Sequence, residues 1–232
     1  MSRQVPLPFA FNAELGFEQF HSGGNEETVA HLRRLAASPD EPLLYLWGGE
    51  SSGKSHLLQA CCREAHAAGL AVSYLPLALL IEYGSEVLEG LEQQDLVCLD
   101  DIDLLAGQPP WEQALFRLFN RLRDGGHRLM VSAGVPPAEL SIALPDLKTR
   151  LSWGLTLMLR PLEDEDRLAA LSLQARSLGL DLPPSVGRFL LAHYRRDLAS
   201  LRQLLERLDQ ASLAAKRKLT IPFLKTYLEE SS

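Results

Sequence analysis

Short apolar runs alternate with helical patterns over the first 160 residues of the chain. Uninterrupted apolar runs are typical of strands that are buried on both faces of a parallel sheet. Between the runs, apolar residues recur at the spacing of amphipathic helices. The alternation predicts an α/β fold with a five-stranded parallel sheet flanked by helices. The expected strands are Leu43–Trp47, Ala71–Leu75, Leu96–Leu99, Leu129–Ala133 and Leu155–Leu159.

The pattern changes at Pro161, after which every periodic segment is helical. We therefore expect an arm over residues 1–14, an α/β domain over 15–160 and a small all-helical domain over 161–232. A chain of 232 residues with 46% hydrophobic content is long and apolar enough to bury a core in each domain. Residues 77–91 are less regular, and we expect a broken helical region there.

The charge of −7 is unevenly distributed. Residues 1–160 hold 12 Lys and Arg against 20 Asp and Glu, whereas residues 161–232 hold 11 against 10. Neither part is the basic surface that a non-specific DNA-binding protein needs, although a few local arginines could still touch nucleic acid. We therefore expect no strong direct binding to nucleic acid.

The cysteines and the apolar segments indicate a cytoplasmic location. Cys61, Cys62 and Cys98 lack the spacing of metal ligands, so we expect reduced, buried packing residues. The N-terminus has no basic-then-apolar leader, and no apolar run approaches the length that spans a membrane.

A phosphate-binding loop follows the first expected strand and precedes a helical pattern. It fits the motif G-x-x-x-x-G-K-[ST], in which backbone N–H groups cradle phosphate, Lys54 reaches the terminal phosphates and the Ser55 hydroxyl binds Mg²⁺. The alternative is a Gly/Ser turn before an ordinary helix, but the flanking strand and helix favour the phosphate loop. The predicted nucleotide-binding residues are Gly48, Gly49, Glu50, Ser51, Ser52, Gly53, Lys54, Ser55 and His56.

Two carboxylates follow the third expected strand and complement the loop. Asp100 is placed to hold Mg²⁺, and Asp101 to orient or activate water, as in a Walker B motif. Polar residues at the carboxyl ends of parallel strands emerge where open α/β sheets bind ligands. Ser132, near the end of the fourth expected strand, is a candidate sensor of the terminal phosphate, although a serine that closes a strand before a turn is more common.

The combination of these motifs resembles the AAA+ ATPases. Arg150 precedes Trp153-Gly154, and a helical lid follows. More narrowly, Phe17-x-x-Phe20 with Gly24-Asn25, and the run from Thr149 to Gly154, are similar to the nucleotide-binding domain of the bacterial replication initiator DnaA. The resemblance covers about residues 15–230.

Two departures from DnaA narrow the resemblance. DnaA continues into a helix-turn-helix DNA-binding domain, whereas this sequence ends at Ser232, directly after the lid. The arm also contains Gln4, Leu7 and Phe9, which fit the Q-x-x-L-x-[LF] motif of proteins that dock on the replication sliding clamp. Alone, this motif is weak, because a loosely packed arm is the simpler interpretation. Together, the features resemble the Hda family of DnaA-homologous regulators.

This resemblance implies a function. It implies that the chain binds ADP or ATP with Mg²⁺, ADP being the expected nucleotide, and docks on the β subunit sliding clamp. It further implies that the chain promotes ATP hydrolysis by DnaA, with Arg150 as an arginine finger in trans, and that it can form a homo-oligomer. Arg196 matches the lid arginine that contacts nucleotide, although Arg195 beside it could shift the alignment by one residue.

Several alternatives stay open at this point. Arg150 could form an ordinary surface ion pair, and Arg196 could be a solvated helix-start arginine. The complete set of nucleotide motifs also allows an autonomous DnaA-like ATPase that loads or remodels a complex at the origin. A factor that positions the initiator through protein contacts is a third possibility. Whether the chain is itself an effective enzyme is therefore undecided.

Overall fold

The computed structural model describes residues 15–37, 41–193, 198–215 and 219–230. Two compact units are present. The sheet unit comprises the described residues of 1–17 and 25–161, and the helical unit comprises those of 18–24 and 162–232. The predicted arm, with Gln4, Leu7 and Phe9, lies outside the described residues, and so do Arg195 and Arg196.

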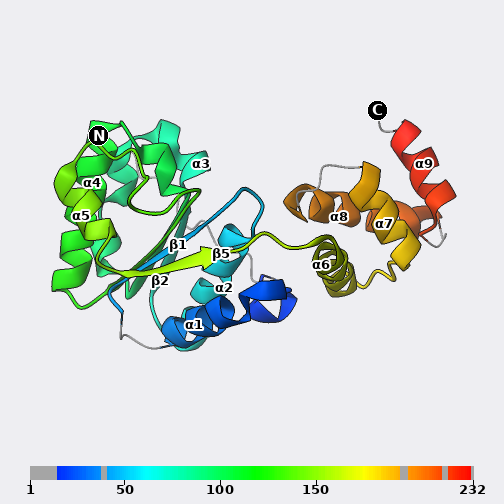
Figure 1. The fold of residues 1–232 in the computed structure, drawn as a ribbon, viewed down its shortest axis with the longest axis horizontal. Coiled ribbons are helices and arrows are strands. Elements are labelled where there is room, and N and C mark those ends of the chain that lie inside the picture. The colour runs from blue at the N-terminus through cyan, green and yellow to red at the C-terminus, as the bar shows by residue number, and fades with distance from the viewer. Residues whose placement is uncertain (1–14, 38–40, 194–197, 216–218, 231–232) are drawn as a thin grey trace. The chain divides into compact units, whose positions relative to one another are not determined.

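The described residues form one five-stranded sheet, in which every adjacent pair of strands is parallel (Figure 1). The strand order is β2-β3-β4-β1-β5. This confirms the predicted fold, with shifts of one residue at several strand ends. The strands are β1 (Leu43–Gly48), β2 (Val72–Pro76), β3 (Leu96–Asp100), β4 (Arg128–Ala133) and β5 (Leu155–Leu159).

Helices cover both faces of the sheet (Figure 1). On β1, Leu44 and Leu46 face one layer, while Leu43 and Tyr45 belong to the apolar cluster that includes Trp111 of α4. The helices of the sheet unit are α1 (Glu26–Ala37), α2 (Lys54–Ala67), α3 (Leu77–Leu80), α4 (Pro109–Asp124) and α5 (Pro145–Leu151).

The region over residues 77–91 is broken, as expected. After α3 it consists of the short 3₁₀ turns η3 (Ile81–Tyr83), η4 (Ser85–Leu88) and η5 (Leu91–Gln93). Gly84 and Gly90 separate these turns with φ values of 89° and 83°. Such values end a right-handed helix, so no continuous helix can form there.

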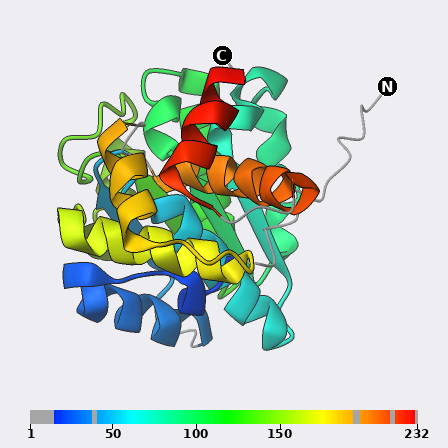
Figure 2. The ribbon, with the colours of Figure 1, turned by 90° about the vertical axis from the view of Figure 1, so that its right-hand side faces the viewer.

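The helical unit contains four α-helices within its described residues (Figure 2). They bury one apolar cluster, in which Leu171, Leu190, Leu205 and Leu208 are almost completely buried. His21 Nε2 lies 2.9 Å from Asp166 Oδ1 and ties residues 18–24 to this unit. The helices are α6 (Asp164–Ser177), α7 (Pro184–His193), α8 (Leu198–Ala215) and α9 (Ile221–Glu230). No helix of the described chain is long and apolar enough to cross a membrane.

A buried arginine joins α1 to the sheet. Arg128, at the start of β4, donates from Nη1 to the carbonyl oxygens of Leu35 at 2.6 Å and Ala36 at 3.3 Å. These carbonyls belong to the last turn of α1, where no intrahelical partner is available. Burial lowers the pKa of Arg128, and the helix end compensates for the lost hydration of its guanidinium.

Gly154 allows the chain to pass closely over β1 before it enters β5. A Cβ atom at this position would lie 2.3 Å from the Leu43 carbonyl oxygen and 2.6 Å from Leu43 Cγ. The first of these atoms belongs to the backbone of a buried strand, so it cannot move aside easily. The glycine therefore fixes the chain immediately after Trp153 and α5.

We expect Gly154→Ala to destabilise the sheet unit by about 1–3 kcal/mol, because the added methyl overlaps β1. Thermal or denaturant unfolding measures this change. Gly24→Ala is the control, since Gly24 has a φ of −75° and no atom within 4 Å of an added Cβ. Equal stability of the two variants would show that the backbone near Leu43 can shift to accommodate the added methyl without a loss of stability.

Candidate functional site

The backbone of the loop between β1 and α2 is curled. Ser51 and Gly53 have φ values of 58° and 99°, in the left-handed region. Gly48 is required at the start, because a Cβ there would lie 2.7 Å from the Leu159 carbonyl oxygen. No side chain caps the start of α2, so its first N–H groups can receive an anion.

The polar side chains of the loop also fit an anion. Lys54 is 8% exposed, and its Nζ donates to the carbonyl oxygens of Gly48 at 3.0 Å and Gly49 at 3.1 Å. The Ser52 hydroxyl is buried and has no hydrogen-bond partner among the described residues. The buried Lys54 ammonium is paired only with neutral carbonyl oxygens, and the Ser52 hydroxyl has no acceptor. Both groups can therefore donate hydrogen bonds to a phosphate.

Asp100 is held between two neighbouring strands. It is 3% exposed at the end of β3. The Tyr74 hydroxyl of β2 donates to its Oδ2 at 2.7 Å, and the Ser132 hydroxyl of β4 donates to its Oδ1. Burial raises the pKa of Tyr74 well above its ordinary value, which keeps this hydroxyl a donor. The carboxylate of the predicted Mg²⁺ ligand is thereby fixed in orientation.

Ser132, the candidate phosphate sensor, is fully buried. Besides donating to Asp100, its hydroxyl accepts a hydrogen bond from the Asp101 backbone N–H at 2.9 Å. The side chain therefore organises both Walker B residues in this structure. Tyr74 was missed in the sequence, because its role depends on β2 lying beside β3, which the sequence pattern did not specify.

Asp101 has an unusual backbone and an unusual carboxyl group. Its φ and ψ are 61° and 55°, a left-handed conformation that turns the chain sharply after β3. Burial raises its pKa to about 6, with Asp100 and Asp103 adding to the increase and Lys54 opposing it. Because β1 and β3 both pair with β4 in parallel, the phosphate loop and the Walker B end of β3 lie at the same edge of the sheet.

Mg²⁺ is commonly held by one or two protein oxygens together with nucleotide phosphates and water. Ser55, in the first turn of α2, and Asp100 provide such oxygens at the predicted site. Within the described part of the chain, no group of three or more His, Cys, Asp and Glu side chains could hold a metal. A cation bound through Ser55 and Asp100 would therefore share its coordination with the nucleotide.

His56 and Arg150, two further predicted site residues, contact residues outside the phosphate loop. His56 Nε2 donates to the Gly16 carbonyl oxygen at 2.9 Å and so joins the N-terminal segment to α2. Arg150, in the last turn of α5, stacks its guanidinium 4.0 Å above the ring of Trp153. No hydrogen bond or ion pair between described residues links Arg150 to the phosphate loop or to any carboxylate. Trp153 is 60% exposed, so the stacked pair is presented at the surface.

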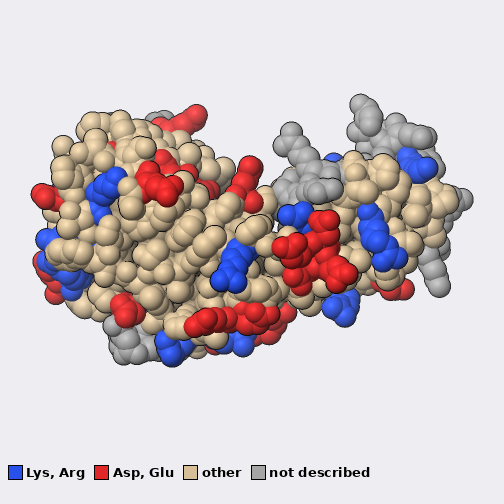
Figure 3. Space-filling model, viewed as in Figure 1, with Lys and Arg blue, Asp and Glu red and all other residues tan. Residues whose placement is uncertain are grey.

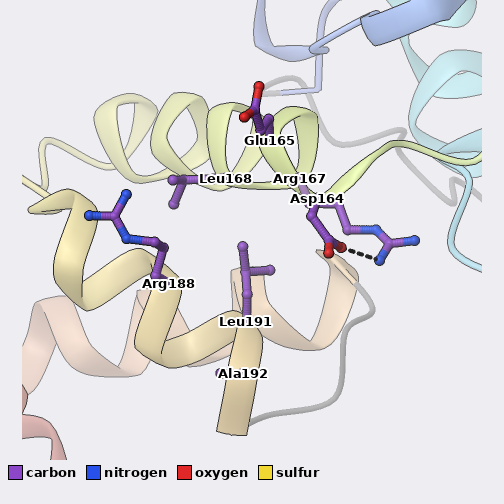
Figure 4. Close-up of a pocket in the computed structure, with 7 residues that line it drawn as sticks. All are labelled: Asp164, Glu165, Arg167, Leu168, Arg188, Leu191 and Ala192. Atoms are coloured by element: carbon purple, nitrogen blue, oxygen red, sulfur yellow. Dashed lines mark hydrogen bonds and ion pairs between the residues drawn. The ribbon is translucent and has the colours of Figure 1, made fainter.

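A separate cavity lies in the helical unit, between α6 and α7 (Figure 4). Its volume is about 410 Å³. Leu168 and Leu191 form apolar walls, and Asp164 accepts a hydrogen bond from Arg167 at 3.1 Å. The cavity is lined by Asp164, Glu165, Arg167, Leu168, Arg188, Leu191 and Ala192, none of which was predicted from the sequence.

The charged side chains are mixed on the face shown in Figure 3. Lys and Arg side chains of the described residues are scattered among Asp and Glu side chains there. Between Arg63 and Arg117 the sequence contains no Lys or Arg at all. Lys and Arg of the sheet unit therefore lie outside residues 64–116.

Two families match the chain. Residues 11–158 match the bacterial DnaA ATPase domain, and residues 164–228 match the Hda lid domain. The first match covers more than half of the 232 residues. The boundary between the matches lies beside Pro161, close to the division between the two units.

Solved structures of DnaA share the fold. Domain III of the Thermotoga maritima replication initiation protein DnaA is 24% identical with a TM-score of 0.77, and the match covers 94% of this chain and 95% of that one. Aquifex aeolicus DnaA bound to AMPPCP is 24% identical with a TM-score of 0.66, over 86% and 67% of the two chains. A DnaA bound to AMPPCP and single-stranded DNA is 20% identical with a TM-score of 0.70, over 90% and 70%.

The raised pKa of Asp101 predicts how stability depends on pH. The folded chain holds this proton more tightly than an unfolded chain, whose Asp pKa is 3.8. Stability is therefore lost as the pH rises from about 4 through about 6. We expect Asp101→Asn to stabilise the nucleotide-free and metal-free protein at pH 7–8 by on the order of 1–3 kcal/mol, and to have little effect near pH 4.

Denaturant unfolding across this pH range checks the prediction. Asp181→Asn is the control, because Asp181 is exposed. A stability difference between the wild type and Asp101→Asn that stays constant from pH 4 to pH 8 would contradict it.

Proposed function

Because the chain belongs to the family of bacterial DnaA ATPase domains and carries an Hda-type lid, we propose that it regulates the initiation of chromosome replication. In this proposal it binds nucleotide, docks on the DNA polymerase sliding clamp and stimulates ATP hydrolysis by DnaA. The initiator is thereby left in its inactive ADP form. The observation that carries the proposal is Arg150, displayed on an exposed tryptophan without a carboxylate partner among the described residues.

The nucleotide, in this proposal, is ADP, bound at the phosphate loop with Mg²⁺. The buried Lys54 ammonium and the unsatisfied Ser52 hydroxyl support phosphate binding there. Ser55 and Asp100 would hold Mg²⁺, which neutralises phosphate charge when it is bound. Ser132 and Tyr74 would keep Asp100 in the orientation that this requires. In this role the site maintains the shape of the sheet unit.

Arg150 supplies the chemistry to the partner. A guanidinium that enters the nucleotide site of another protein stabilises the charge on the transferring phosphoryl group. Stacking on Trp153 orders the arginine and leaves its N–H donors available at the surface. The exposed indole adds an apolar anchor, and Trp and Arg are the side chains that most often dominate protein interfaces.

The clamp contact rests on the sequence of the arm. Gln4, Leu7 and Phe9 fit a short extended motif that fills a preformed groove at low entropic cost. Docking on a DNA-loaded clamp would concentrate the chain where DnaA acts, in the cytoplasm. Direct binding of nucleic acid by the chain is then unnecessary, and the face shown in Figure 3 carries charges of both signs.

An autonomous ATPase is the second candidate. Lys54, Ser55, Asp100 and Asp101 form a complete set of motif residues. Asp101, with a pKa of about 6, is mostly ionised at neutral pH. It can therefore act as a base toward water. Steady ATP turnover by the isolated protein that is lost in Asp101→Asn would favour this function over the proposed one.

We expect Arg150→Ala to abolish most of the stimulation of DnaA hydrolysis, with a decrease of about 10³-fold at saturating protein. Arg150→Lys should also be strongly impaired, because an ammonium lacks the planar fork of the guanidinium. Arg117→Ala, at an exposed position on α4, is the control. Single-turnover hydrolysis of ATP bound to DnaA measures the effect, and stimulation retained by Arg150→Ala would remove the arginine from the mechanism.

We expect Gln4→Ala combined with Leu7→Ala to weaken clamp binding by roughly 10–100-fold, because two of the three anchors are lost. Titration of immobilised clamp with the full chain measures the affinity. Val5→Ala is the control, since this position is free in the motif. Unchanged affinity of the double variant would mean that the arm is not the clamp-binding segment.

A further inference from the structure

Glu112, in the first turn of α4, is a buried carboxylate that binds three backbone amides. It is 1% exposed. Its Oε1 accepts hydrogen bonds from the N–H groups of Gly107 at 2.8 Å and Ala143 at 3.0 Å. Its Oε2 accepts one from the N–H of Leu144 at 2.7 Å. No ion pair of Glu112 occurs among the described residues.

These three donors explain why a glutamate occupies the position. Burial of an unpaired carboxylate is costly unless several donors replace its hydration. A carboxylate accepts at both oxygens, so it can satisfy Gly107, Ala143 and Leu144 together. A glutamine of the same shape would direct an NH₂ group at one of these N–H donors. A residue with only a packing role does not require an acceptor at both positions.

The bound amides lie at two functionally important segments. Gly107 follows Walker B through η6 (Ile102–Leu105), whereas Ala143 and Leu144 lead directly into α5. Leu144 is the residue before α5, and no side chain within α5 caps that helix. Glu112, from a different helix, therefore accepts hydrogen bonds from the two amides immediately before α5.

The position of α5 determines the position of Arg150. The helix has seven residues, and Arg150 lies in its last turn, about 8 Å along the axis from its start. Shortly after the C-terminal end of α5, Gly154 packs closely against Leu43 of β1, which restricts the position of that end. Leu147 and Leu151 hold its inner face in the core. With its start bound to Glu112, the short helix is fixed at both ends.

We propose that Glu112 is a positioning residue for Arg150. Its hydrogen bonds to the amides of Ala143 and Leu144 set the start of α5, and through this short helix they set the place at which the Arg150–Trp153 pair meets a partner. Glu112 itself touches neither nucleotide nor partner. The inference rests on the proposed function, in which Arg150 enters the nucleotide site of DnaA.

The experiment compares the full-length protein with Glu112→Gln on DNA-loaded clamp and ATP-bound DnaA. The amount of protein is titrated, and the maximal single-turnover rate is separated from the concentration that gives half of it. We expect the maximal rate of Glu112→Gln to fall by about 10–100-fold, because a displaced arginine is less effective at any occupancy. The half-saturating concentration should change little. A smaller folded fraction alone would instead raise that concentration and leave the maximum unchanged.

Three controls make the test specific. Glu139→Gln, at an exposed position of the segment before α5, should behave as the wild type. Glu112→Gln combined with Arg150→Ala should be no slower than Arg150→Ala alone, because residues that act through one group are not additive. Hydrogen exchange should accelerate at the amides of Ala143 and Leu144 and in α5, while the phosphate loop remains protected.

A second variant protects the test against misfolding. If Glu112→Gln does not fold, Glu112→Asp keeps the charge but shortens the reach to the three amides, and the same loss of maximal rate is expected. A wild-type maximum in the folded variant would overturn the inference, provided that Arg150→Ala is inactive. If Arg150→Ala is itself active, the proposed function fails. In that case, hydrogen exchange at the amides of Ala143 and Leu144 in the Glu112 variant still shows whether Glu112 holds the start of α5. Exchange at the wild-type rate would overturn this structural role.

Discussion

The hydrogen bonds that Asp100 accepts from Tyr74 and Ser132 are the contacts on which the arrangement of the site depends. They join the carboxyl ends of β2, β3 and β4, and they orient the carboxylate at the same edge of the sheet as the phosphate loop that follows β1. A buried carboxylate needs such donors, so the three strands must stay in this register. The left-handed turn at Asp101 begins where this network ends, and it directs the chain toward η6 and Glu112.

From the Walker B end, a second set of polar contacts extends to the surface. Glu112 binds the amide of Gly107 after η6 and the amides of Ala143 and Leu144 before α5. At the other end of α5, Gly154 passes against Leu43. A helix of only seven residues gains little stability by itself, so these contacts fix Arg150 more than helix propensity does. The arginine finger that we propose thus belongs to the same compact unit as the nucleotide site.

The fold was largely predictable, because its strands are continuous apolar runs and its motifs are contiguous in the sequence. The loop from Gly48 to Ser55 and the Asp100-Asp101 pair could be recognised for this reason. The contacts of Tyr74 and Ser132 could not, since they depend on the order of the strands. Glu112 and Arg128 were also missed, because a charged residue in a helix or at a strand end usually faces solvent, and only the packed structure shows that these two are buried.

In the function that we propose, the decisive hydrolysis occurs on DnaA and not in this chain's own site. The most direct measurement follows radiolabelled ATP bound to DnaA in a single turnover, with the chain carrying unlabelled ADP on DNA-loaded clamp. We predict that the label on DnaA is converted to ADP much faster when the chain is present, while the isolated chain releases negligible phosphate from ATP. Intact label on DnaA, together with steady ATP turnover by the isolated chain, would contradict it.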